Sequence, residues 1–235
     1  MNGRGFSIRS PIRGSRRVSL GDCLRLQSAL HLRLFMTSAL SNAIAGLCSP
    51  EYRVRLAAAL EIYRAGRAPA DRAVYSWWGD AEFSRVLLGP NPIVTVGLAV
   101  ERETFAKIRA ANGGPRLASV PPDQDAEEFE LYFPDGISLD ILTTREPGGS
   151  GAIARYLAKF GEGVQQVEFR CLDVDRATSI LKEKFDIAPI YPATRAGADG
   201  TRVNFFIVPA PGTGKVLIEF YEAVSRPEPS TSASH

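Results

Sequence analysis

Polar side chains that could carry chemistry alternate along VQQVEFRCL, residues 164–172, a segment with the pattern of a strand. Side chains two positions apart share one face of a strand, so Gln166, Glu168 and Arg170 point the same way and Gln165 points the other way. If that face is partly buried, Glu168 is poised as a general base. Arg170 would then either neutralise Glu168 or bind a carboxylate or phosphate of a substrate.

Histidine chemistry is nearly excluded in the folded part of this chain. The only two histidines are His31, in a basic leader, and His235, at the end. The three cysteines are widely spaced and form no C-x-x-C pair, which argues against a zinc site and favours a reducing compartment. Any acid–base work therefore has to come from other side chains.

The composition bounds the class of protein. With 235 residues and 45% hydrophobic content, the chain is long enough for one large domain or two small ones. No apolar run approaches the roughly 18 to 20 residues that span a bilayer, so no membrane partner is expected. Seven of the 28 basic residues lie in the first 49 positions beside a single acid, which leaves the remainder mildly acidic and argues against nucleic acid as a partner.

The first 48 residues are expected to be a basic, disordered leader. The stretch MNGRGFSIRSPIRGSRRVSL is rich in Arg, Ser and Gly and lacks acids, as mitochondrial transit peptides are. Because Met36 offers a second start, we expect a cytoplasmic protein whose residues 1 to about 36 are removable, with mitochondrial targeting as the alternative. Residues 223–235 are expected to be a disordered tail.

Residues 49–90 read as a helical appendage, with a helix that begins after Ser49 and Pro50 and stops at Gly66. From residue 91 the pattern changes to a strand, a helix and three strands up to residue 144. The same order recurs over residues 163–222, with a linker between the two copies. Two copies of a βαβββ unit predict an α+β domain over residues 91–222, built on one eight-stranded sheet.

This tandem βαβββ pattern resembles the vicinal oxygen chelate (glyoxalase/bleomycin-resistance) superfamily, and within it most closely methylmalonyl-CoA epimerase-like proteins. The resemblance is carried by IVTVGLAV, by SGAIARYLAKFGEGVQQVEFRCLDVDRATSILKEKF and by RVNFFIVPAPGTGKVLIEFYE. It covers residues 91–222 and implies the half-barrel fold.

The resemblance also implies where a metal site would lie, with one ligand on each of four strands. The matching positions are Thr95, Asp140, Gln166 and Glu219, so two of the usual histidines are replaced. Three of these residues are oxygen donors, which would suit Mg²⁺, Mn²⁺ or Ca²⁺. The alternative is a site that has lost its metal.

Two functions are compatible with the resemblance. The first is an enzyme of the epimerase, isomerase or cyclase (lyase) type that removes a proton beside the carbonyl of a small carbonyl or acyl-thioester compound, with Glu219 and Glu168 as candidate bases. Arg170, Tyr221 and Tyr132 are the candidate substrate-binding residues. The second is a protein that binds a small molecule without catalysis. A homodimer is the expected partner arrangement.

Overall fold

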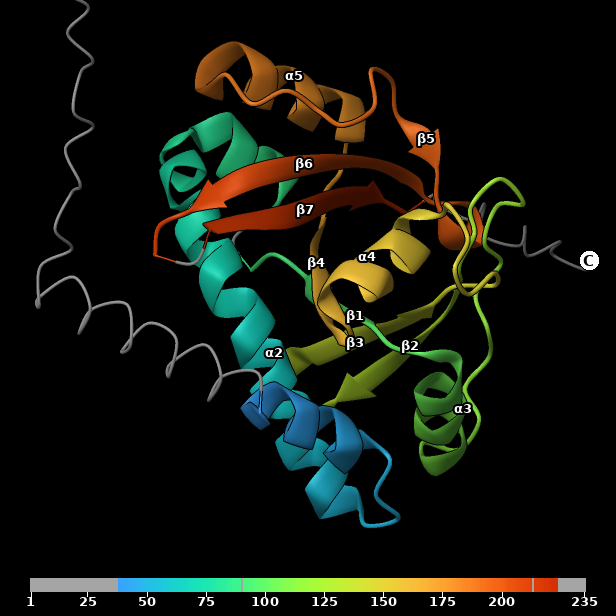
Figure 1. The fold of residues 1–235 in the computed structure, drawn as a ribbon. Helices are drawn as coiled ribbons and strands as arrows, with labels where there is room; N and C mark the ends of the chain where they lie inside the picture. The colour runs from blue at the N-terminus through green and yellow to red at the C-terminus, as the bar shows by residue number, and fades with distance from the viewer. Residues whose placement is uncertain (1–37, 90, 213, 224–235) are drawn as a thin grey trace, which may run out of the picture. The chain divides into compact units, whose positions relative to one another are not determined.

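The computed structural model describes residues 38–89, 91–212 and 214–223, and its centre is one curled sheet of seven strands (Figure 1). The strand order is β2-β3-β1-β4-β7-β6-β5. The strands are β1 (Val94–Ala99), β2 (Glu127–Phe133), β3 (Ile137–Thr143), β4 (Gly163–Arg170), β5 (Arg195–Ala196), β6 (Arg202–Ala210) and β7 (Gly214–Glu222).

The sheet is built from two similar halves that meet at the antiparallel pair β1 and β4. In one half β1 pairs with β3 in parallel, and β3 pairs with β2 antiparallel; in the other, β4, β7 and β6 repeat that arrangement. Helices α3 (Arg102–Ala111) and α5 (Val174–Phe185) each follow the first strand of their half. The predicted α+β half-barrel of two repeats is therefore confirmed.

The predicted count of eight strands is wrong. Residues 116–122 run alongside β2, where the Ala118 N–H donates to the Glu128 carbonyl at 2.9 Å, but they form no strand. Pro121 and Pro122 lack an N–H and cannot extend the ladder. In the second half the equivalent strand is reduced to the two residues of β5.

The two outer edges of the half-barrel are tied together by the segments that replace these strands. The N–H of Asp199 donates to the Ser119 carbonyl at 3.0 Å, and the N–H of Ser119 donates to Asp199 Oδ1 at 2.9 Å. Gln124 Nε2 donates to the Ala196 carbonyl at 2.8 Å. The concave face is therefore bridged by loops at one end.

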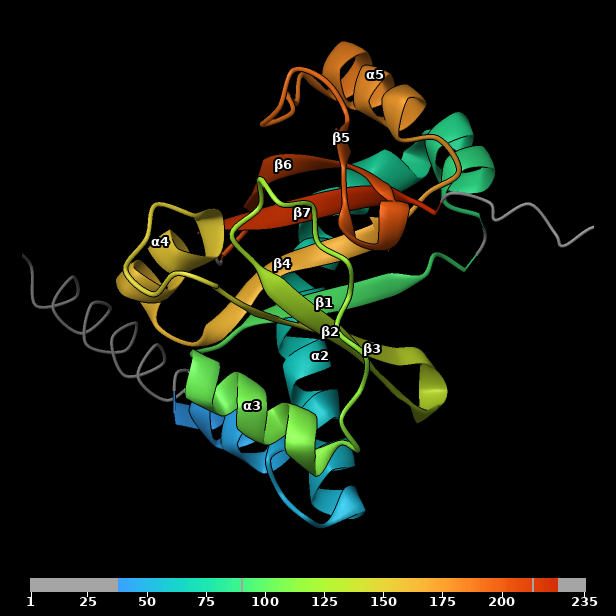
Figure 2. The same ribbon diagram turned by 90° about the vertical axis from the view of Figure 1, so that its right-hand side faces the viewer.

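Helix α4 (Ala152–Phe160) covers another part of the concave face, although residues 145–162 were predicted to be a linker. Its Ile153 and Leu157 pack in a small core with Ala99 and Leu142, which point to the concave side of β1 and β3. Figure 2 shows α4 beside the sheet, away from α3 and α5.

Helix α2 (Tyr52–Val74) crosses the convex face and contacts strands of both halves, namely β1, β3, β4, β6 and β7. The prediction that it stops at Gly66 is wrong, because the helix continues for two more turns with Gly66 buried inside it. A Cβ on Gly66 would lie 2.5 Å from Val96 Cγ1 and 3.2 Å from Val164 Cγ1. Glycine at this position permits close approach of the helix to the sheet.

We expect Gly66→Ala to destabilise the protein by about 1–3 kcal/mol, because the added methyl overpacks the contact with Val96. Chemical denaturation would measure the loss, and the double variant Gly66→Ala/Val96→Ala should recover part of it. Gly79→Ala is the matched control, since nothing lies within 4 Å of its added Cβ. A Gly66→Ala protein as stable as the parent would mean that the helix-propensity gain outweighs the close contact.

The part of the expected leader that the structure describes is ordered and packed, contrary to the prediction. Residues 38–47, assigned to a disordered leader, are helical, and Ala43, Ile44 and Leu47 are buried in the main core. Residues 1–37 and the tail from 224 lie outside the described residues, so the transit peptide and the compartment stay predictions, as do the domain boundaries. No helix in the described part of the chain is long and apolar enough to cross a membrane.

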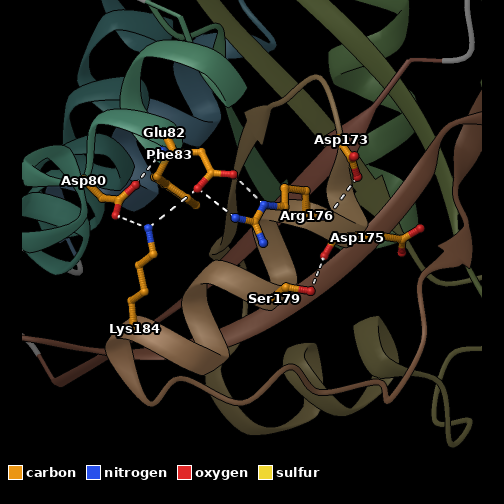
Figure 3. Close-up of polar contacts among 8 residues, drawn as sticks. All are labelled: Asp80, Glu82, Phe83, Asp173, Asp175, Arg176, Ser179 and Lys184. Atoms are coloured by element: carbon orange, nitrogen blue, oxygen red, sulfur yellow. Dashed lines mark hydrogen bonds and ion pairs between the residues drawn. The ribbon is translucent and has the colours of Figure 1, made fainter.

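After α2 the chain forms η1 (Tyr75–Gly79) and the π-helical turn η2 (Glu82–Leu87), which pack on the second half of the sheet. An ion network fixes η2 to α5 (Figure 3): Arg176 Nε lies 2.5 Å from Glu82 Oε1, and Lys184 Nζ lies 2.6 Å from Asp80 Oδ2. Phe83, the residue after Glu82, is fully buried.

Candidate functional site

The concave face encloses a cavity of about 1040 Å³ that extends under the bridging loops to the start of α4. Strand alternation places the polar side chains here, while the opposite face of the same strands packs under α2. All but one of the eight predicted site residues line this cavity, namely Tyr132, Asp140, Gln166, Glu168, Arg170, Glu219 and Tyr221.

Both glutamines of β4 line the cavity, so the expectation that Gln165 points to the other face is wrong. In the pairing of β1 with β4, Gly97 lies opposite Gln166 but Leu98 lies opposite Val164. Gln165 is therefore the extra residue of a β-bulge, which interrupts the alternation. Its Oε1 atom is buried and has no hydrogen-bond partner among the described residues.

Gln166 joins two buried carboxyl groups on neighbouring strands. Its Nε2 donates to Glu219 Oε2 at 2.7 Å and to Glu168 Oε1 at 3.0 Å. Glu168 and Glu219 are direct partners across β4 and β7, and each is only 8% exposed. A Cβ on Gly97 would lie 2.5 Å from Gln166 Cγ, so glycine opposite Gln166 leaves room for this side chain.

Three further carboxyl groups lie on β2 and β3. Glu130 faces Asp140 across the strand pair, and Glu128 is two residues before Glu130 on the same face. Asp140 is buried and its Oδ1 has no hydrogen-bond partner within the described ranges. The hydroxyl of Tyr132 donates to Glu130. Alternation along EEFELYF places Glu128, Glu130 and Tyr132 on one strand face, but the sequence alone does not show which of them enters the cavity.

Burial and mutual repulsion favour the protonated form of four carboxyl groups, those of Glu128, Asp140, Glu168 and Glu219. Burial raises the pKa of Glu168 to about 8, against the hydrogen bond from Gln166 that lowers it. Burial, and then the charge of Glu130, raise the pKa of Glu128 to about 7. The pKa values of Asp140 and Glu219 also lie well above the usual range, first through burial and then through the charges of Glu128 and Glu168 respectively. Protonated and ionised carboxyl groups therefore coexist near neutral pH.

We expect the unfolding free energy to fall as the pH rises from about 4.5 to about 8. A carboxyl group with a raised pKa holds its proton in the folded protein and loses it in the unfolded chain, so stability is full below the unfolded pKa and declines as the folded group ionises. Glu128→Gln cannot ionise and should flatten the part of the curve below about 7. Urea titrations at a series of pH values would measure this, and an unchanged slope in Glu128→Gln would contradict it.

The remaining predicted residues are placed as follows. Thr95 is buried beside the site and its hydroxyl donates to Ser138 Oγ at 3.2 Å. Arg170 is exposed at the end of β4, and its side chain forms no ion pair with Glu168. Tyr221 lies next to Arg170 across β4 and β7, and burial raises the pKa of its hydroxyl.

The residues predicted to hold a divalent cation do not fit one as they are arranged here. Gln166 presents its amide nitrogen to both glutamates, and a nitrogen that donates hydrogen bonds cannot ligate a metal. The Thr95 hydroxyl is directed to Ser138. Within the described part of the chain no group of three or more His, Cys, Asp or Glu could hold a metal ion. A divalent cation at this site stays a prediction.

The fold is a curled half-barrel of seven strands in two similar halves, with a cavity on its concave face. Solved structures similar to this chain include methylmalonyl-CoA epimerase from Mycobacterium tuberculosis, at 27% identity over 60% of this chain and 92% of that chain, with a TM-score of 0.48. A Streptomyces coelicolor methylmalonyl-CoA epimerase variant in complex with 2-nitronate-propionyl-CoA is 23% identical over 57% of this chain and 99% of that chain, with a TM-score of 0.45.

A third similar structure is a methylmalonyl-CoA epimerase in complex with methylmalonyl-CoA and NH₄⁺, at 24% identity over 59% of this chain and 98% of that chain, with a TM-score of 0.45. No protein-family model matches the chain, and a comparison with curated proteins finds no significant match. Similarity at this level does not transfer an activity, so function has to be argued from the cavity itself.

Proposed function

We propose that the protein is an enzyme of the isomerase or epimerase type that moves a proton at the carbon beside the carbonyl of a small carbonyl or acyl-thioester compound. One observation carries the proposal. Two buried glutamates of neighbouring strands, Glu168 and Glu219, are joined through Gln166 inside a cavity large enough for a small substrate. Convergent carboxyl groups favour chemistry over simple binding, because burying several acids together costs stability and needs a functional reason.

The two glutamates have different roles, which depend on whether each carboxyl group is ionised or protonated. Like charges on adjacent strands disfavour simultaneous ionisation, so as the pH rises towards about 8 one member of the pair ionises while the other holds its proton. The ionised carboxylate removes the proton from the carbon beside the carbonyl. The protonated member donates a hydrogen bond to the carbonyl oxygen, where negative charge develops as the enolate forms. Return of the proton to carbon completes the reaction.

Gln166 acts as a positioning residue in this scheme. Both hydrogens of its amide are used by the two glutamates, so Gln166 orients the carboxyl groups and does not itself bind the enolate. The Thr95 hydroxyl is likewise engaged with Ser138. These contacts leave neither the Gln166 amide nor the Thr95 hydroxyl free to donate to the enolate.

Arg170, Tyr221 and Tyr132 remain the candidate residues for holding the rest of the substrate. Arg170 lies in the cavity lining without an acidic partner among the described residues, whereas Arg116 and Arg195 are paired with Asp199 and Asp123. A free guanidinium can bind a carboxylate or phosphate at the outer end of a substrate. The expected homodimer stays a prediction.

Hydrogen–deuterium exchange tests the proposed reaction. The protein would be incubated in D₂O with a panel of acyl-CoA esters and simple ketones, and mass spectrometry would measure deuterium at the carbon beside the carbonyl. We expect the protein to catalyse deuterium incorporation into at least one class of carbonyl compound. This exchange is detectable even where no net conversion of the compound takes place. Saturable binding without exchange across the panel would favour the alternative, a non-catalytic small-molecule-binding protein of the same fold.

A further inference from the structure

The carboxyl groups of β2 and β3 form a second acidic group that the proposed proton transfer does not use. Glu130 and Asp140 are direct cross-strand partners, and Glu128 lies on the same face. Like charges directly opposite each other destabilise a strand pair. Unlike Glu168 and Glu219, these acids have no amide between them.

Among the described residues no cation forms an ion pair with this group, although the charge of Arg116 acts on Glu130. Arg116 is bound to Asp199, and Arg195 to Asp123. Arg145 is near enough to Glu128 to lower its pKa, but its guanidinium donates to the Gln124 carbonyl.

Asp140 is the residue least satisfied by the protein. It is 6% exposed, lines the cavity and has a buried Oδ1 with no hydrogen-bond partner in the described part of the chain. A buried acceptor without a partner destabilises the folded protein, because the hydration that it loses on burial is not replaced. A ligand that brings its own donors would recover that cost.

Part of the opposite wall of the same cavity, where Glu219 and Arg195 also lie, is apolar and aromatic. It is formed by side chains of the second half of the sheet and the segment before β5, namely Ile190, Tyr191, Val203, Phe205 and Leu217. Tyr191 and Phe205 pack against each other with their ring centroids 6.0 Å apart. The cavity therefore has an acidic wall on β2 and β3 and an apolar patch on the opposite side, beside Glu219.

We propose that the carboxyl groups of Glu128, Glu130 and Asp140 bind the ammonium group of a small amphipathic molecule whose apolar part lies on the opposite wall. An ammonium group has three donors and one charge, which matches a set of separate acceptors that lack a counterion. In so far as this molecule is the substrate, the inference rests on the proposed function and narrows its substrate class to amine-bearing carbonyl compounds. Binding of an ammonium group would favour the ionised form of Glu128 and Asp140, whose pKa values are raised in the free cavity, whereas an anionic group would not.

Three probes of similar shape and different charge test the inference: phenethylammonium, phenethyl alcohol and hydrocinnamate. Calorimetry at neutral pH should show the cation binding at least about tenfold more tightly than the alcohol, and no binding of the carboxylate. Asp140→Asn and Glu128→Gln should each weaken the cation about tenfold and leave the alcohol nearly unchanged. Glu103→Gln, on the exposed surface of α3, is the matched control and should have no effect.

Equal or tighter binding of the carboxylate, or no binding of the cation, would overturn the inference. It would also be overturned if Mg²⁺, Mn²⁺ or Ca²⁺ bound in place of the organic cation and lost affinity in Asp140→Asn. These outcomes are separable from failure of the proposed function. Binding of the cation without deuterium exchange on any carbonyl compound rejects the enzyme and keeps the ammonium site, whereas exchange limited to anionic acyl thioesters does the reverse.

Discussion

Glu219→Gln should lower the rate of deuterium exchange beside the substrate carbonyl by about 10²- to 10⁴-fold, the range expected for loss of a general acid or base. Glutamine keeps the size of the side chain but can neither accept the proton nor share one with Glu168. Its amide would also face the Nε2 of Gln166, which now donates to Glu219 at 2.7 Å. Initial rates at saturating substrate, followed by mass spectrometry, would measure the effect.

The matched control is Glu103→Gln, the same substitution at an exposed residue of α3 that pairs with Lys107 outside the cavity. Metal content measured on both variants adds a second readout. Loss of exchange together with loss of a bound cation would mean that Glu219 ligates a metal, and loss of exchange alone would assign it to proton transfer. Full exchange in Glu219→Gln would remove the central residue from the proposed mechanism.

Phe83→Ala should cost about 3–5 kcal/mol of unfolding free energy, the range for deletion of a fully buried phenylalanine. Phe83 comes from η2 and packs edge to face with Trp77 of η1 and with Phe220 of β7, at centroid distances of 5.7 and 5.5 Å. We expect a single cooperative transition, because this aromatic contact makes the helical segment part of the main core. Thermal and urea unfolding followed by circular dichroism would measure the loss.

Tyr75→Ala serves as the control, since Tyr75 lies in the neighbouring η1 segment and is 78% exposed. The unfolding free energy of Tyr75→Ala should be within about 0.5 kcal/mol of that of the parent protein. A separate early transition in Phe83→Ala, with the main transition unchanged, would show instead that the helical segment is an independent appendage of the half-barrel.

Much of the half-barrel could be predicted because strands have a fixed side-chain period. Alternation along β3, β4 and β7 placed Asp140, Glu168 and Glu219 on one face, and the structure brings these side chains to one cavity. Their chemical roles stay predictions. The bulge at Gln165 could not be foreseen, because no glycine or turn residue marks it and it follows from how β4 pairs with β1.

The other errors share a physical cause, which is that tertiary contacts overrode local preferences. A glycine such as Gly66 often marks the end of a helix. Here the helix packs so closely on Val96 that only glycine leaves enough room at this position. The apolar residues of the segment that ends in Pro121 and Pro122 predict a strand. The segment forms no strand, because the two prolines have no N–H to donate to a neighbouring strand. The short helix α4 was not predicted, because glycines surround it in the sequence. Its burial against Ala99 and Leu142 depends on the curl of the sheet, which the sequence does not show.

The path of α2 across both halves of the sheet has a consequence for how two molecules could share an active site. Folds made of two equivalent modules can exchange a module between chains, and each composite site then draws on both. Here one half of the sheet could be exchanged with a second chain only if α2 lost its packing on that half. The lost contacts would be those with β1 and β3, or those with β4, β6 and β7. The acids of β2 and β3 and those of β4 and β7 are therefore held within one polypeptide. Mixing an Asp140→Asn protein with a Glu219→Gln protein should give no complementation.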